Sequence, residues 1–137
     1  MGKSIKEVMS SDVRTCEPDA TVVDVARVMA KEDVGPIPLV DGGRLVGIVT
    51  DRDLVVRVLA EGKDPKTTKV GEVASRKLVT VSPDQDLDQA LKLLAENQVR
   101  RLPVVEGDRV VGIVAQADIA RLGEDVKTGE VVEEISR

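Results

Sequence analysis

The chain has 137 residues, a formal net charge of −5 and no Phe, Tyr, Trp or His, so His-based catalysis and His metal ligands are excluded. Its single cysteine permits neither an internal disulfide nor a cysteine-rich zinc site, and we expect no metal and no cofactor. Acidic charge without aromatic stacking groups argues against nucleic-acid binding, and the lack of a long apolar run or a signal peptide predicts a cytoplasmic protein without a membrane span.

Two copies of one unit make up most of the chain. When the sequence is shifted by 65 positions, residues 5–58 lie over residues 70–123 without a gap, with 17 identities among 54 positions. The strongest block places residues 37–42 against residues 102–107. An ungapped match of this length indicates a duplicated unit.

Each copy begins with a polar lead-in, a short extended stretch and a turn signal. The extended stretches cover residues 13–17 and 78–82, and a Pro-Asp turn pair follows each. Apolar residues then recur at i, i+3, i+4 and i+7, which predicts an amphipathic helix in each copy. These residues are Val22, Val25, Ala26 and Met29 in the first copy and Leu87, Ala90, Leu91 and Leu94 in the second. The pairs with capping-box spacing at the helix starts are Thr21 with Asp24 and Asp86 with Gln89.

Two apolar strands follow in each copy and are joined by a glycine-containing turn. The turns lie at residues 41–43 and 106–108, where glycine supplies the positive φ of a tight hairpin. The second strand is almost wholly apolar, which predicts burial on both of its faces. A second helix is expected to begin near Asp51 or Gln116. Each unit is therefore predicted to be β-α-β-β-α, and the fold class to be α/β (α+β).

The repeat also predicts the domain organisation. We expect a first domain at residues 3–60, a linker at 61–69, a second domain at 70–123 and an acidic C-terminal tail at 124–137. One unit of about 55 residues is marginal alone, because small domains bury little of their surface. We therefore expect the two units to pack as a pseudo-twofold pair with a ligand-binding cleft between them.

The duplicated unit resembles a cystathionine-β-synthase (CBS) domain. The resemblance is carried by Val8-Met9 in the lead-in, Pro-Ile-Pro-Leu-Val-Asp at 36–41 and Gly-Ile-Val-Thr-Asp-Arg-Asp at 47–53, with the amphipathic helix in its expected place. Order, spacing and duplication make the match across residues 3–123, since no single motif is decisive. Two tandem copies resemble a CBS pair, or Bateman module, a family whose members bind adenine nucleotides or adenosyl compounds between the two domains.

That resemblance implies one ligand site built mainly on the first copy. In the family a Thr and an Asp spaced like Thr50 and Asp53 hold the ribose hydroxyls, and an ionised carboxylate can accept from two vicinal hydroxyls. Arg100 and Arg101 of the second copy are implied to meet the phosphates, which guanidinium groups bind in bidentate fashion. The residues implied to frame the adenine are Val13, Arg14 through its backbone, Val34, Gly35, Pro36 and Ile37.

A second site, around Asp118, departs from the family pattern. Ala115 stands where the Thr is expected, so one ribose partner is missing. The facing residues of the first copy, Gly35 and Pro36, offer no charge to a phosphate. We therefore expect one strong site per chain.

Structural interpretations of the same residues remain open. Thr50 and Asp53 also have capping-box spacing at a helix start, and both roles are compatible because a helix N-terminus favours an anion. Arg100 and Arg101 fit solvated surface charge as well as a phosphate site. Cys16 is interpreted as a small strand residue and not as a reactive thiolate.

The sequence thus favours a regulatory, non-catalytic module that binds an adenine nucleotide and signals to a separate, unidentified partner protein. AMP is the leading ligand, followed by ADP, ATP and adenosyl compounds. We also expect a homodimer, with Val55, Val56 and Leu59 supplying an apolar helix face. Two alternatives are a structural dimerisation module with an empty cleft and an enzyme using carboxylates or Lys. The enzyme is the weaker one, because no acid–base pair stands at a recognisable spacing.

Overall fold

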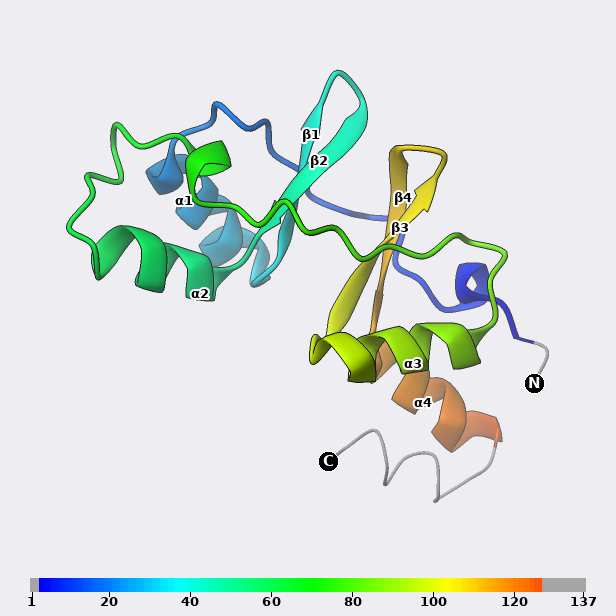
Figure 1. The fold of residues 1–137 in the computed structure, drawn as a ribbon. Helices are drawn as coiled ribbons and strands as arrows, with labels where there is room; N and C mark the ends of the chain where they lie inside the picture. The colour runs from blue at the N-terminus through cyan, green and yellow to red at the C-terminus, as the bar shows by residue number, and fades with distance from the viewer. Residues whose placement is uncertain (1–2, 127–137) are drawn as a thin grey trace. The chain divides into compact units, whose positions relative to one another are not determined.

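The computed structural model describes residues 3–126, and its helices and strands follow one another in the same order in both copies of the repeat (Figure 1). The acidic tail predicted at 124–137 lies outside the described residues from 127 onward. No described helix is both long and apolar enough to cross a membrane. The elements are η1 (Ile5–Glu7), α1 (Val22–Glu32), β1 (Ile37–Asp41), β2 (Arg44–Val49), α2 (Asp51–Leu54), the π-helical turn η2 (Val55–Leu59), η3 (Val70–Glu72), α3 (Leu87–Asn97), β3 (Arg101–Glu106), β4 (Arg109–Ala115) and α4 (Gln116–Val126).

Two compact units form, and each takes its lead-in from the other copy of the repeat. One unit comprises residues 14–78, whereas the other joins the N-terminal residues through Val13 to the chain from Val79 onward. The N-terminal lead-in reaches the second copy through the amide of Ile5, which donates to the carbonyl of Gln85 at 2.9 Å. The lead-in of the second copy in turn pairs with β2, within the unit of the first copy.

Each unit contains a two-stranded antiparallel sheet with a third, extended stretch at its edge. β1 pairs with β2 and β3 with β4, each with an irregular register at one point. Gly42 and Gly43 have φ of 62° and 87° in the first hairpin turn, as the turn prediction requires. Cys16 bridges Leu39 in parallel, and the matching stretch of the second copy bridges β3 in the same way. The predicted α-β-β-α order is confirmed in both copies, whereas the predicted first strand of each copy is an extended stretch that makes a single isolated bridge.

The amphipathic helices are confirmed, with one error in their predicted caps. Thr21 caps α1, since its hydroxyl oxygen accepts from the amide of Asp24 at 3.3 Å. Asp86 occupies the N-cap position of α3, but its side chain accepts no hydrogen bond from that helix. Both helices end on a left-handed residue, Asp33 or Gln98, each with φ of 55°.

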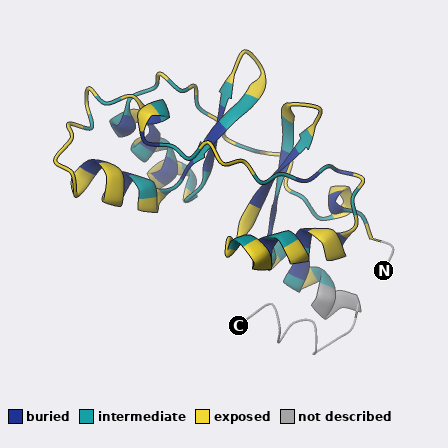
Figure 2. Cartoon of the chain, viewed as in Figure 1, coloured by how far each residue is buried: buried dark blue, intermediate teal, exposed yellow. Residues whose placement is uncertain are grey.

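Each unit has its own aliphatic core (Figure 2). The expectation that the second strand is buried on both faces is wrong, because Leu45 and Ile48 remain half-buried while Val49 is fully buried. α1 and α2 lie on the same side of the β1–β2 sheet (Figure 1), and along the end of β2 the buried residues Gly47 and Val49 alternate with the half-buried Ile48. The buried core of the unit at 14–78 consists of Val22, Val25, Met29, Ile37, Leu39, Val49, Leu54, Val58, Val70 and Val73.

Candidate functional site

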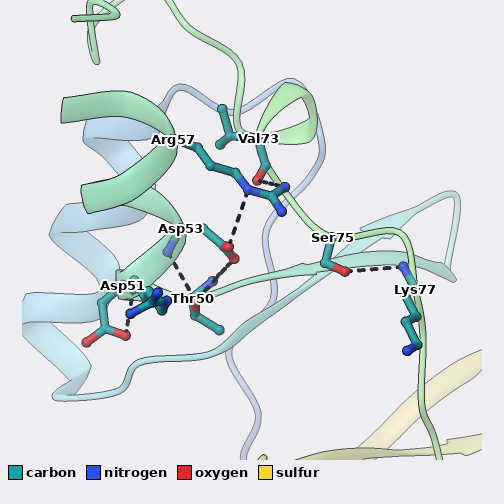
Figure 3. A network of polar contacts seen from close by, with 8 residues as sticks. Thr50, Asp51, Asp53, Arg57, Val73, Ser75 and Lys77 are labelled. Atoms are coloured by element: carbon teal, nitrogen blue, oxygen red, sulfur yellow. Dashed lines mark hydrogen bonds and ion pairs between the residues drawn. The ribbon is translucent and has the colours of Figure 1, made fainter. Parts of the chain in front are cut away.

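Thr50 and Asp53 form a reciprocal hydrogen-bonded pair where β2 ends and α2 begins (Figure 3). The amide and hydroxyl of Thr50 donate to Oδ2 of Asp53 at 2.8 and 3.1 Å, and the amide of Asp53 donates to the Thr50 hydroxyl oxygen at 3.2 Å. The capping-box interpretation is therefore confirmed. These bonds also fix the Asp53 carboxylate in one orientation at a helix N-terminus.

The second oxygen of Asp53 faces a cation that the sequence did not single out. Nε of Arg57 lies 3.9 Å from Oδ1 of Asp53, and Nη1 of Arg57 donates to the carbonyl of Val73 at 3.2 Å (Figure 3). The Asp53 side chain is only 18% exposed, whereas that of Arg57 is 50% exposed. Arg57 and Oδ1 of Asp53 therefore form a long ion pair, and Oδ1 can still accept a hydrogen bond from another donor.

The loop before β1 lies directly against the start of α2. A Cβ atom built on Gly35 would stand 3.1 Å from Oδ1 of Asp51, tighter than ordinary van der Waals contact. Asp51 is itself held, because its Oδ1 accepts from the amide of Arg52 at 3.1 Å. Glycine at position 35 therefore lets this loop approach the helix that carries Asp53.

The extended stretch before α1 runs along β1 on its other edge. The amide of Cys16 donates to the carbonyl of Pro38 at 3.1 Å, and the carbonyl of Cys16 accepts from Val40 at 2.8 Å. Two residues earlier, Arg14 forms an ion pair with Glu32, the last residue of α1, at 3.3 Å. Partial burial, with a smaller contribution from Asp24, raises the pKa of the Cys16 thiol above 9.0, which agrees with an unreactive strand residue.

The structure divides the predicted site residues between the two units. The unit at 14–78 contains those expected at the ribose and most of those expected at the adenine, and β1 begins beside the end of β2 because Ile37 pairs with Val49. The site residues of this unit are Arg14, Val34, Gly35, Pro36, Ile37, Thr50 and Asp53. The site residues of the other unit are Val13, Arg100, Arg101 and Asp118.

The second copy holds its aspartate differently. Oδ2 of Asp118 accepts from the amide of Ala115 at 3.3 Å, but Ala115 has no hydroxyl to complete the pair. Oδ1 of Asp118 contacts the guanidinium of Arg121. The carbonyl of Arg100 accepts from the amide of Gln116 at 2.8 Å, so the backbone before β3 lies at the start of α4. The arginine side chains there are exposed.

Sequence reasoning missed Arg57 and the contact of Gly35 with Asp51. The i, i+4 spacing of Asp53 and Arg57 on one helical segment was the available signal for the first. The bond from Arg57 to Val73 joins residues 16 positions apart and leaves no local pattern. Within residues 3–126 no group of three or more His, Cys, Asp or Glu side chains is placed to hold a metal ion.

The family model of the CBS domain matches residues 5–60 and 70–125, and the chain belongs to this family as a tandem CBS pair. The CBS domain-containing protein YhcV of Bacillus subtilis is 43% identical over 117 residues, which cover 85% of this chain and 83% of that protein. Hypoxic response protein 1 of Mycobacterium tuberculosis is 38% identical over 117 residues, which cover 85% of this chain and 82% of that protein.

Solved structures show the same fold. A crystal structure of Hypoxic Response Protein I with two coordinated zinc ions has a TM-score of 0.80 at 38% identity and covers 87% of this chain and 98% of that one. The CBS domain pair of protein MJ0100, in complex with 5′-methylthioadenosine and S-adenosyl-L-methionine, has a TM-score of 0.80 at 28% identity. The match covers 91% of this chain and 98% of that one. The present chain has no His and a single Cys.

Proposed function

We propose that this CBS pair is a regulatory module that binds an adenine nucleotide or an adenosyl compound, with AMP as the leading ligand. The observation that carries the proposal is the Asp53 carboxylate, held by Thr50 at a helix N-terminus with one oxygen still able to accept. The bound adenosyl compounds of the MJ0100 pair support the same ligand class.

Each part of the ligand has a matching group in this chain. Vicinal ribose hydroxyls would donate to Asp53, with the Thr50 hydroxyl as a second polar partner. The adenine would lie against the apolar residues around Gly35, a position where a larger side chain would meet Asp51. Arg100 and Arg101, both exposed, are the proposed phosphate ligands.

The proposed role is regulatory and not catalytic. The Asp53 carboxylate is already used as a helix cap, and the ionisable group paired with it is the guanidinium of Arg57, which stays protonated and is a poor general acid or base. Ligand occupancy would be communicated to a separate partner protein or to a second copy of the chain. A structural module with no ligand is the alternative that the following experiment separates.

The test is a thermal unfolding series with AMP, ADP, ATP, adenosine and S-adenosyl-L-methionine. Linkage predicts about 2.7 kcal/mol of stabilisation per site at a hundred times the dissociation constant, enough to raise the melting temperature by several degrees. Without Trp or Tyr the protein absorbs little near 260–280 nm, so a retained adenine compound is also visible in the spectrum of the purified protein. If none of these compounds shifts the melting temperature, the structural-module alternative is preferred.

A further inference from the structure

Arg57 joins the candidate ribose carboxylate to a backbone segment outside the site. Its guanidinium lies 3.9 Å from Asp53 through Nε and donates to the carbonyl of Val73 through Nη1 at 3.2 Å. The residue sits in the π-helical turn η2, and π-turns frequently mark functional positions. One side chain thus contacts both the ligand-facing group and the end of η3 (Figure 3).

The segment that Arg57 holds is the one through which the chain leaves this unit. After Val73, Ser75 and Ile48 exchange amide–carbonyl bonds of 2.9 and 3.0 Å, which attach the segment to β2. The hydroxyl oxygen of Ser75 then accepts from the amide of Lys77 at 3.2 Å (Figure 3). Leu78 is the last residue of the unit, and the chain continues directly into the second repeat.

The second repeat lacks this connection. Leu122 stands at the position equivalent to Arg57, and it has no charge to offer Asp118. The cation that pairs with Asp118 is Arg121, which precedes Leu122 by one position. Both members of this ion pair lie on α4, three positions apart, so the pair connects no second segment of the chain. Among the described residues, an arginine that connects the aspartate to the following backbone segment is therefore found only in the first repeat, where Arg57 contacts Asp53 and Val73.

We propose that Arg57 is a positioning residue that couples occupancy of the Asp53 carboxylate to the segment at 73–77. A ligand hydroxyl that donates to Oδ1 of Asp53 adds a further restraint on the carboxylate that Thr50 already orients. The more strongly restrained carboxylate holds the Arg57 guanidinium, and the guanidinium holds the Val73 carbonyl. Binding then steadies the segment that leads to the second repeat. The proposal rests on the proposed function, because it requires a hydroxyl-bearing ligand at Asp53.

The experiment uses the full chain with three variants and AMP as the probe. Arg57→Met keeps the apolar stem of the half-exposed side chain and removes the guanidinium, so folding is preserved. Arg57→Lys keeps the charge beside Asp53 but lacks the fork needed to reach both partners. Arg27→Met is the matched control, since Arg27 forms an exposed pair with Asp24 on α1. Amide hydrogen exchange is measured with and without AMP, together with AMP affinity by calorimetry.

Without ligand, Arg57→Met should raise the exchange rate of the Ser75 and Ile48 amides roughly tenfold, as expected for losing one charge-assisted hydrogen bond. Arg27→Met should leave these amides unchanged. AMP should slow exchange at Ser75 in the wild type, but not in Arg57→Met or Arg57→Lys. Arg57→Lys should still bind AMP within a few-fold of wild type, which separates the coupling from ligand affinity.

Four results would overturn the proposal, and they are distinguishable from one another. Unchanged Ser75 exchange in ligand-free Arg57→Met would show that the bond to Val73 does not hold the segment. AMP protection at Thr50 without any at Ser75, or equal Ser75 protection in wild type and Arg57→Met, would remove the coupling and leave nucleotide binding intact. AMP without effect on any wild-type amide would remove the proposed function and the coupling together.

Discussion

The amide of Ile5 donates a hydrogen bond to the carbonyl of Gln85 at 2.9 Å, although the two residues belong to different copies of the repeat. Ile5 is completely buried in a core with Leu87 and other residues of the second copy. Its repeat equivalent, Val70, is equally buried in the core of the unit at 14–78. Each copy therefore supplies an apolar residue that completes the other copy's unit.

Replacing Ile5 by Ala should destabilise the unit that contains α3. The cavity and the lost apolar contact cost about 2–5 kcal/mol for a buried Ile-to-Ala change. Hydrogen exchange should then accelerate in α3 and leave α1 unaffected. Val70→Ala is the matched control and should accelerate exchange in α1 instead. If Ile5→Ala loosens α1, the described exchange of lead-ins is contradicted.

The sequence predicted the elements of this fold but not the exchange of lead-ins. α1, α3 and the hairpins follow from local periodicity and turn glycines, which the chain carries within each copy. The exchange has no such signal, because Ile5 and Val70 are both apolar and their residue types do not indicate which core each one fills. Which one fills which core depends on chain connectivity and not on residue pattern.

The same distinction applies to the candidate site. The spacing of Thr50 and Asp53 predicted a pair that the structure contains. The role of Arg57 could not be predicted from the sequence, because it depends on the hydrogen bond to the Val73 carbonyl. Only the folded chain brings that carbonyl, 16 positions away in the sequence, next to Arg57. Likewise, the need for glycine at position 35 becomes evident only when Asp51 is placed beside it.

Arg100 and Arg101 are predicted to select for phosphate. Replacing both with Ala should reduce the preference for AMP over adenosine, because the lost interaction is with the charged group. The salt dependence of AMP binding should also weaken, since screening acts on that electrostatic contribution. Calorimetry with AMP and adenosine at two salt concentrations measures both effects. A double variant that keeps the wild-type preference would show that these arginines are surface charge.

The chain is predicted to be a homodimer. Val55, Val56 and Leu59 are 55%, 43% and 65% exposed on one helical segment, an apolar group without a described partner within the chain's cores. Light scattering should give about twice the 14.7 kDa chain mass. Leu59→Lys should shift the protein toward the monomer, because it places a charge in the proposed interface. A wild-type monomer at tens of micromolar would contradict this prediction.

Cys16 is predicted to react slowly with alkylating reagents below pH 9. Its pKa is raised by burial and then by Asp24, so the folded protein favours the neutral thiol. The resulting contribution to folding stability is complete below the ordinary value of 9.0 and is lost as the pH rises through the folded pKa. The rate of iodoacetamide modification should therefore reach half its maximum above pH 9.0. A midpoint below that value would contradict the assigned environment.

Asp53 is predicted to matter more for ligand binding than Asp118. Asp53→Ala should weaken AMP binding by about 1.5–3 kcal/mol, the usual cost of losing a charged hydrogen-bond partner. Asp118→Ala should have a smaller effect, because Ala115 offers no hydroxyl beside it. Since Asp53 also caps α2, Thr21→Ala serves as a control that removes only the cap of α1 and costs about 1 kcal/mol of stability.

Titration calorimetry of AMP against the wild type and these three variants tests the central claim most directly. The account predicts measurable binding to the wild type and to Thr21→Ala, with a loss of about tenfold to more than a hundredfold in Asp53→Ala. It also predicts a smaller loss in Asp118→Ala. Equal affinity in wild type and Asp53→Ala would contradict the assignment of the ribose carboxylate, and equal losses in both aspartate variants would contradict a single strong site.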